Sequence, residues 1–380
     1  EILMETSMTA IPYKGVKIFN DDGTFSKSED VVQGRSFSSN LTKMMKHMDK
    51  LTALQQGKPP SPVMAHISLT NACNLTCSFC CFANRDISDK MPTEKVFQAL
   101  ESFKQIGITG VEFTGGGEPS IHPDFKEIVN YAKDLGFSLG ICTNAARFGL
   151  DRAIKKDIVE QFDWVRMGMY GFYEGYDYDL RVFEGTNCKP SAAYVWDENL
   201  ATSNNPNITG EWTDVANKRV LSKKFQTTDN FVRMLDWVEE NKIPCRIAFN
   251  AIKDVKETAK DIETIREIIQ SYEEDRGHKL QSAFLSDFNF KGERRNDHCY
   301  MHMVKPFLFT DGYIYACPSA ELSIENNYNY VPESQFAVCD IDGIEEFYSK
   351  PPTLRHHACH YCKYAIQNEL IDDVLTDTIH

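Results

Sequence analysis

The sequence of 380 residues lacks several features that would place it in a large class of proteins. It has no apolar run approaching the roughly 18 residues that a membrane-spanning helix needs, so we expect no membrane partner. Its first ten residues, EILMETSMTA, have neither the basic start nor the apolar stretch of a secretory signal. These absences favour a cytoplasmic location.

A strongly basic region is also missing. The formal net charge is −14, and the nearest approach to a basic patch is the pair of runs at residues 218–219 and 223–224. We interpret those runs as a solvated surface. Proteins that bind a nucleic-acid backbone usually carry a basic face, so a nucleic-acid polymer is an unlikely partner.

Cysteine, in contrast, is abundant. The chain has 12 cysteines, and several of them stand in tight groups. In a small secreted protein such a count would indicate disulfides. In a long chain without a signal, the grouping favours metal or iron–sulfur ligation in a reducing compartment.

From Val63 onward, short apolar segments alternate with amphipathic ones, which predicts strands alternating with helices. The predicted strands are residues 63–69, 110–114, 138–143, 164–170, 244–251 and 281–285. Short, mostly apolar strands of this kind are typical of buried parallel sheets. Six strand–helix units predict an α/β fold, a partial (β/α)6 TIM-like barrel rather than a closed barrel of eight.

This pattern divides the chain into three parts. Residues 1–62 are an N-terminal extension, residues 63–290 form the barrel, and residues 291–380 form a small C-terminal α+β domain. Within the barrel, residues 172–226 are polar, bear aromatic residues and are poorly periodic. We interpret them as an insertion and a candidate substrate lid.

The first group of cysteines is Cys73, Cys77 and Cys80, directly after the first predicted strand. Three thiolates on one loop can hold three irons of a [4Fe-4S] cluster and leave the fourth iron open to a small molecule. A zinc site is the alternative, because structural zinc takes four ligands and Cys81 is a nearby fourth thiol.

The segment NACNLTCSFC resembles the signature of the radical S-adenosylmethionine (SAM) superfamily, C-x3-C-x-aromatic-C, with Phe79 at the aromatic position. The resemblance extends over most of the chain. It implies a SAM-binding [4Fe-4S] cluster, reductive cleavage of SAM to a 5′-deoxyadenosyl radical, and abstraction of hydrogen from a substrate. It also implies a reductant such as flavodoxin or ferredoxin.

Two further segments resemble SAM-binding motifs of this family. The turn after the second predicted strand resembles the GGEP motif, which places Gly116, Gly117 and Glu118 beside the SAM amino group. Glycines let a backbone approach a ligand closely, and a carboxylate can pair with an ammonium. Asn144, in a Thr-Asn-Ala segment, resembles the TNG segment near SAM.

The fourth predicted strand departs from the family. Where many relatives have S-x-D-G, this chain has Gly168 and Tyr170, so the usual polar contacts are not carried over. Arg166 is a candidate for the SAM carboxylate, with a structural salt bridge as the alternative. Asn250, at the end of the fifth predicted strand, is a candidate SAM contact or a cap.

The second group of candidate ligands is Cys299, Cys317, Cys359 and Cys362. A hairpin predicted at Asp311-Gly312 would bring the first two together, and four thiolates suffice for a closed [4Fe-4S] cluster or for zinc. The region resembles the auxiliary-cluster domain of SPASM and Twitch enzymes, and the one-cluster Twitch type matches better. We interpret Cys339 as a buried thiol rather than a ligand.

An auxiliary cluster with four ligands suits an electron acceptor or a brace. We therefore favour an oxidoreductase that acts with net oxidation on a small polar metabolite or a peptide. The alternatives are a redox-neutral epimerase or isomerase with Cys188 as hydrogen donor, a ribosomal-peptide maturase, and a zinc protein without catalysis. Tyr170 and Asp287, at predicted strand ends, are candidates for proton transfer.

Overall fold

The computed structural model describes residues 47–75, 77, 79–82, 85–169, 178–196, 212–214, 219–221, 228–249, 255–285, 292–293, 298–319, 330–351, 355–356, 361–362 and 364–376. Its central feature is a ten-stranded sheet in the order β14-β13-β12-β1-β2-β3-β4-β5-β8-β9. From β12 to β9 every neighbouring pair is parallel, whereas β13 and β14 are joined by antiparallel pairing.

The sheet strands are β1 (Met64–Ile67), β2 (Gly110–Phe113), β3 (Ser138–Thr143), β4 (Trp164–Gly168), β5 (Lys189–Trp196), β8 (Cys245–Phe249), β9 (Ala283–Leu285), β12 (Phe307–Leu308), β13 (Tyr313–Tyr315) and β14 (Ala337–Asp340). Three short ladders lie outside it: β6 (Trp212–Asp214) with β7 (Arg219–Leu221), β10 (Gly292–Glu293) with β16 (Tyr361–Cys362), and β11 (His298–Cys299) with β15 (Arg355–His356).

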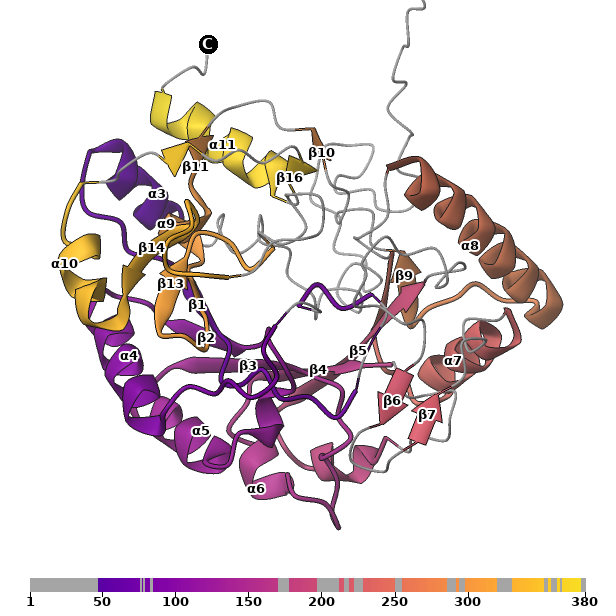
Figure 1. Cartoon of the computed structure of the whole chain (residues 1–380). Helices are drawn as coiled ribbons and strands as arrows, with labels where there is room; N and C mark the ends of the chain where they lie inside the picture. Colours follow the sequence, from indigo (N-terminus) through magenta and orange to yellow (C-terminus); the bar gives the residue numbers. More distant parts are fainter. Residues whose placement is uncertain are drawn as a thin grey trace, which may run out of the picture.

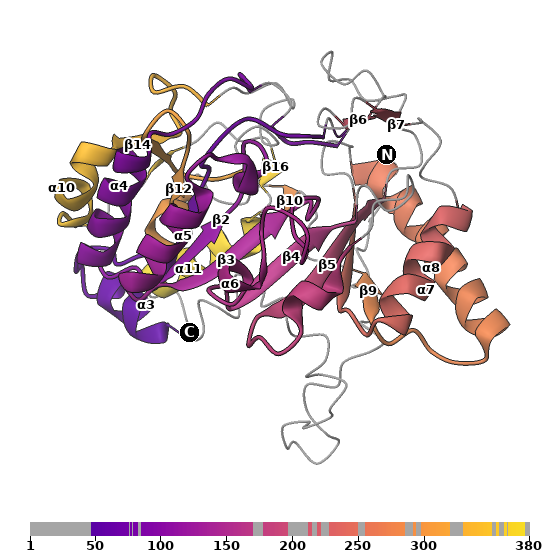
Figure 2. The ribbon, with the colours of Figure 1, turned by 90° about the horizontal axis from the view of Figure 1, so that it is seen from below.

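The sheet curves, and helices cover its convex side (Figure 1). These helices are α4 (Thr93–Gln105), α5 (Phe125–Asp134), α6 (Lys156–Val159), α7 (Thr228–Glu240), α8 (Val255–Arg276) and α10 (Ile344–Tyr348). Figure 2, seen from below, shows α5 and α6 in front of the strands. The remaining helices are α3 (Met48–Gln55), α9 (Met301–Val304) and α11 (Ala365–Thr376).

Side chains in a strand alternate between the two faces of the sheet. Those that face the helices are apolar and belong to one continuous core, which includes Ala65, Ile67, Val111, Phe113, Leu139, Ile141, Val165 and Met167. The residues between them face the concave side. There, β1 to β4 carry the polar side chains His66, Glu112, Cys142 and Arg166.

All six predicted strands are confirmed, as β1, β2, β3, β4, β8 and β9, and so is the hairpin at Asp311-Gly312. In that hairpin β12 pairs with β13 in antiparallel register, and Gly312 has the positive φ of +84° that suits glycine in a turn. None of the helices in the described part of the chain is long and apolar enough to cross a membrane.

The count of six parallel strands was wrong. β5 lies inside the predicted insertion and pairs with both β4 and β8, so residues 189–196 belong to the sheet. This strand was not predicted because the residues on either side of it are polar. In the structure, Tyr194 and Trp196 of this strand are fully buried against Phe231 of α7. At the other edge, β12 pairs with β1, so the predicted C-terminal domain contributes strands to the same sheet.

Candidate active site

The first cysteine group lies on the loop after β1, at the carboxyl edge of the parallel strands. The backbone N–H of Cys80 donates to the Cys77 carbonyl at 3.1 Å, and that of Leu75 donates to Cys73 Sγ at 3.4 Å. Burial and the Glu118 carboxylate raise the pKa of the Cys73 thiol to about 12, and burial raises the pKa of Cys77 as well. These thiols therefore lose their protons and become thiolate ligands only when they bind a metal.

Arg85 folds back across this loop. Its Nε donates to the Asn71 carbonyl at 2.8 Å, and its Nη1 donates to the Phe82 carbonyl at 2.6 Å and to Cys80 Sγ at 3.4 Å. A guanidinium therefore stands beside the thiols. Arg85 was not predicted as a site residue, and its position five residues after Cys80 was the one available signal.

This donor set fits an iron–sulfur cluster. Within the part of the chain that the structure describes, no three His, Cys, Asp or Glu side chains form a group that could hold one metal ion. The thiolates of a cubane bind different irons, so they need not converge on one point. Cys73, Cys77 and Cys80 lie close enough to influence one another's pKa. Three soft sulfur donors on one loop suit the ligation of an iron–sulfur cluster.

The glycine turn after β2 packs directly on the cysteine loop. Gly116 has φ +57°, and a Cβ there would lie 2.3 Å from Ser68 Oγ. A Cβ on Gly117 would lie 1.9 Å from the Ala72 carbonyl oxygen, to which the Glu118 N–H donates at 2.9 Å. These glycines therefore allow two segments of the chain to meet, in addition to the ligand approach expected from the sequence.

The buried Glu118 carboxylate joins this turn to the end of β3. It accepts hydrogen bonds from Ser120, from Thr143 Oγ1 at 2.6 Å and from the Asn144 N–H at 2.7 Å. Burial raises its pKa against the opposing effect of these donors. Asn144 Nδ2 in turn donates to Asn74 Oδ1 at 2.6 Å, on the cysteine loop. Three predicted SAM-binding segments thus form one connected unit.

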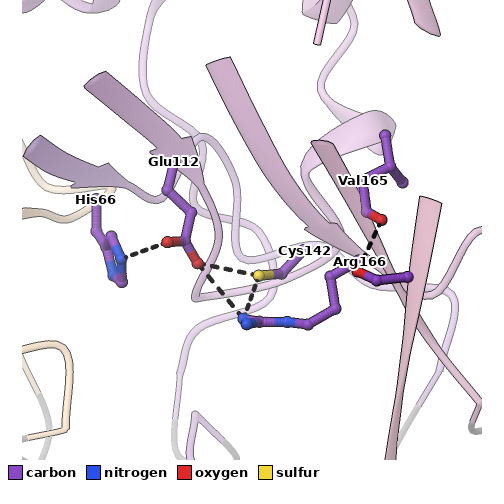
Figure 3. Close-up of polar contacts among 6 residues, drawn as sticks. His66, Glu112, Cys142, Val165 and Arg166 are labelled. Carbon is purple, nitrogen blue, oxygen red and sulfur yellow. Dashed lines mark hydrogen bonds and ion pairs between the residues drawn. The ribbon is translucent and has the colours of Figure 1, made fainter. Parts of the chain in front are cut away.

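A second polar group lies on the concave face, with members from four adjacent strands (Figure 3). Glu112 contacts His66 Nε2 at 2.9 Å, Cys142 Sγ at 3.0 Å and Arg166 Nη2 at 3.5 Å, and it is only 4% exposed. Burial alone would raise the pKa of Glu112, but His66, Lys305 and Arg166 hold it well below its usual range. A carboxylate on this face therefore stays ionised.

These contacts bear on Arg166, a candidate for the SAM carboxylate. Its Nη2 also donates to Cys142 Sγ, and its guanidinium lies 5.8 Å from the centre of the Trp164 ring. The arginine thus makes the salt bridge weighed as the alternative. His66 and Glu112 were not predicted as site residues, although a polar residue between apolar ones in a buried strand was a usable signal.

Three of the four candidate ligands in the second group come together. Two short ladders carry them, with Cys299 opposite Arg355 and Gly292 opposite Cys362. Cys299, Cys317 and Cys362 pack in one cluster with Met301 and Tyr364. Ser319 N–H donates to Cys317 Sγ at 3.2 Å, and Tyr364 N–H donates to Cys362 Sγ at 3.3 Å. Cys359 lies outside the described residues.

Other predicted positions fall elsewhere. Cys188 immediately precedes β5, whereas Cys73 follows β1, so in a parallel sheet the two lie at opposite edges. Cys188 is buried in the main core, and burial raises its pKa to about 12. This position favours a buried thiol over the predicted role as hydrogen donor. Cys339 packs on the main core rather than with Cys299.

Three further candidates, Tyr170, Asn250 and Asp287, lie outside the described residues. Phe79 is partly exposed on the cysteine loop.

Comparison with known proteins gives several partial matches. The chain is similar to an S-adenosylmethionine-dependent nucleotide dehydratase of Selenomonas ruminantium, 32% identical over 98 residues, which cover 26% of this chain and 35% of the relative. It is also similar to Fe-coproporphyrin III synthase of Methanosarcina barkeri, 27% identical over 230 residues, 60% of this chain and 51% of the relative. The chain thus spans about half or less of these relatives.

Among solved structures, the chain is similar to Streptococcus suis SuiB bound to precursor peptide SuiA. The TM-score is 0.49 at 15% identity, covering 87% of this chain and 73% of that chain. Residues 67–177 match the model of the Radical SAM superfamily. That segment contains the cysteine loop, the glycine turn and β2 to β4, which form the connected unit described above. Residues 67–177 of this chain therefore form a domain of the Radical SAM superfamily.

Proposed function

We propose that this chain reductively cleaves SAM to a 5′-deoxyadenosyl radical and uses it to abstract hydrogen from a small polar metabolite or a peptide. The observation that carries the proposal is the hydrogen-bonded unit of cysteine loop, glycine turn and Asn144. A [4Fe-4S] cluster on Cys73, Cys77 and Cys80 supplies an iron with an open position for SAM. Flavodoxin or ferredoxin is the proposed reductant.

The chain's own residues would hold SAM against that loop. Glu118 offers a carboxylate, fixed by Thr143 and Asn144, for the SAM ammonium. Gly116 and Gly117 keep the turn close to the cysteine loop. Phe79 lies between Cys77 and Cys80 in the sequence. Contacts of SAM with Arg166 and Asn250 are part of the proposal.

The substrate would lie on the concave face of the sheet. We propose that this curved sheet is an open TIM-like barrel with more strands than the six expected. Residues 1–62 would be an N-terminal extension, and residues 291–380 a C-terminal domain that contributes β12 to β14 to the sheet. The ionised Glu112, flanked by His66 and Arg166, makes its floor polar and favours a polar substrate. Residues 172–226 outside β5 would act as a lid. Relatives acting on a nucleotide and on a peptide support this range of substrates.

A second [4Fe-4S] cluster would be held by Cys299, Cys317, Cys359 and Cys362. The packing of three of them around Tyr364 supports this assignment. Burial raises the pKa of Tyr364, and Cys317 and Glu112 contribute to the rise, which supports a position of the second group near the concave face. An electron acceptor beside the substrate favours net oxidation, and hence an oxidoreductase.

A redox-neutral epimerase or isomerase is the second candidate function, and Cys142 is the observation that favours it. Cys142 presents a thiol on the concave face, beside Glu112 and Arg166. Burial, ahead of the opposing effect of Arg166, raises the pKa of this thiol to about 12. Cys142 therefore keeps the S–H that a hydrogen donor needs. It lies on the concave face, whereas Cys188 lies in the main core.

Anaerobic reconstitution tests the proposal. The wild-type chain should bind about eight irons with matching sulfide, as two [4Fe-4S] clusters require, and form 5′-deoxyadenosine from SAM with dithionite. Cys77→Ala should abolish that product, whereas Cys245→Ala, on the helix-facing side of β8, should retain it. Binding of zinc in place of iron, without SAM cleavage, would leave only the non-catalytic alternative.

A further inference from the structure

The guanidinium of Arg85 is held beside the cysteine loop by three acceptors of different kinds. Two are backbone carbonyls, of Asn71 before the first cysteine and of Phe82 after the last, at 2.8 and 2.6 Å. The third is Cys80 Sγ at 3.4 Å. The carbonyl contacts fix where the group lies, and the sulfur contact directs one N–H at a cluster ligand.

The charge of Arg85 reaches beyond Cys80. The guanidinium is close enough to all three thiols to interact with them electrostatically, because its two carbonyl contacts flank the cysteines in the chain. Among the groups that act on Cys73, the Glu118 carboxylate has the opposite sign. One cation, Arg85, therefore lies beside the three sulfurs, and one anion, Glu118, acts on Cys73.

The sign of the effect follows from electrostatics. A [4Fe-4S] cluster with three thiolates gains one negative charge when it is reduced by one electron. A nearby positive charge and an N–H directed at a ligand sulfur both stabilise the more negative state. Partial burial strengthens the effect, because a half-buried pair is screened less than one in water.

We propose that Arg85 is a positioning residue that raises the reduction potential of the SAM-binding cluster, through its charge and its hydrogen bond to Cys80. This inference rests on the cluster of the proposed function. Arg85 does not touch the reacting atoms. It acts through Cys80, and it makes the cluster easier to reduce by the electron donor.

The test is a redox titration, followed by electron paramagnetic resonance, of the reconstituted full-length chain without SAM. The signal of the first cluster is identified in a parallel sample by its change when SAM is added. Arg85→Gln removes the charge, Arg85→Lys keeps it, and Arg147→Gln is the matched control, since Arg147 is an exposed arginine at the same edge of the sheet. Iron and sulfide are counted for every variant.

Arg85→Gln should lower the ratio of reduced to oxidised cluster at least tenfold at a fixed potential, which is about 59 mV for one electron. Arg85→Lys should stay within about threefold of the wild type, and the control should not differ from it. An unchanged ratio in Arg85→Gln, with full iron, would overturn the inference while leaving the proposed function intact. Equal shifts in the Gln and Lys variants would also overturn it, because the charge would then have no part.

Loss of iron is informative too. If Arg85→Gln fails to bind iron while Arg85→Lys binds it fully, the positive charge is needed to hold the three thiolates, which supports the inference. If both variants lose iron equally, Arg85 is only a brace for the backbone at Asn71 and Phe82. If the wild type itself binds no iron, the proposed function fails rather than the role of Arg85.

Discussion

The Glu118 carboxylate accepts a hydrogen bond from the Asn144 backbone N–H at 2.7 Å. This contact joins the glycine turn after β2 to the end of β3, and Asn144 extends the connection to the cysteine loop through Asn74. Residues far apart in the sequence are thus fixed relative to the three cysteines before any ligand binds, and this preorganisation lowers the cost of binding.

Glu118→Gln should weaken SAM binding by about 10- to 100-fold, the effect of losing a charge-assisted contact worth roughly 1.5–3 kcal/mol. The amide would also place an N–H₂ group among donors from Ser120, Thr143 and Asn144. Equilibrium dialysis of SAM against the reconstituted protein measures the change. Glu127→Gln, an exposed position on α5, is the control, and equal affinity in both variants would remove Glu118 from the SAM site.

Gly116→Ala should destabilise the chain by about 3 kcal/mol or more and reduce its iron content. The new Cβ would combine a positive φ, worth roughly 1–2 kcal/mol, with a close contact to Ser68 that forces a shift. Gly57→Ala is the matched control, because Gly57 has φ +70° and open space around it. Urea unfolding of both variants separates the cost of the positive φ from the cost of the close contact. An equal loss of unfolding free energy in the two variants would contradict the packing described for the turn.

Cys142 should resist alkylation by iodoacetamide at pH 8. Its pKa of about 12, raised by burial, leaves almost no reactive thiolate, whereas an ordinary cysteine with a pKa of about 8.5 reacts readily. Labelling should increase only as the pH approaches 12 or when urea unfolds the chain. Mass spectrometry of the tryptic peptide gives the extent, and rapid labelling of the folded protein at pH 8 would contradict the buried contacts with Glu112 and Arg166.

Cys317→Ser should reduce the iron content below about eight per chain, towards about four, since removing one thiolate weakens the hold on the second cluster. Formation of 5′-deoxyadenosine should persist, because the first cluster is untouched. Cys339→Ser should leave the iron content unchanged, since Cys339 packs against the main core. A loss of iron in the Cys339 variant would make that residue a ligand in place of Cys359.

Local patterns predicted much of the fold and of the cofactor site. The apolar segments that became β1 to β4 were recognisable because each is short, continuous and flanked by turns, and the cysteine loop is defined by spacing alone. β5 was missed because its flanks are polar and its burial depends on Phe231, far along the chain. The pairing of β12 with β1 was missed for the same reason, since long-range contacts leave no local pattern.

The concave face shows the same limit for the site. His66, Glu112 and Arg166 stand on separate strands, and only the parallel register brings them together. Arg85 likewise acquires its role from the fold of the loop over Asn71. The position of Cys188 was not predicted, because nothing in its neighbourhood of the sequence indicated that a sheet strand begins at the next residue.

The most direct test of the central claim is the magnetic coupling between SAM and the reduced cluster. SAM labelled with ¹⁵N in its amino group is added to the reduced, reconstituted chain, and electron–nuclear double resonance is recorded. We predict a ¹⁵N coupling that identifies nitrogen bound to iron in the wild type and in Cys317→Ser, and that is absent in Cys77→Ala. A reduced cluster that shows no coupling to the labelled SAM would contradict the account.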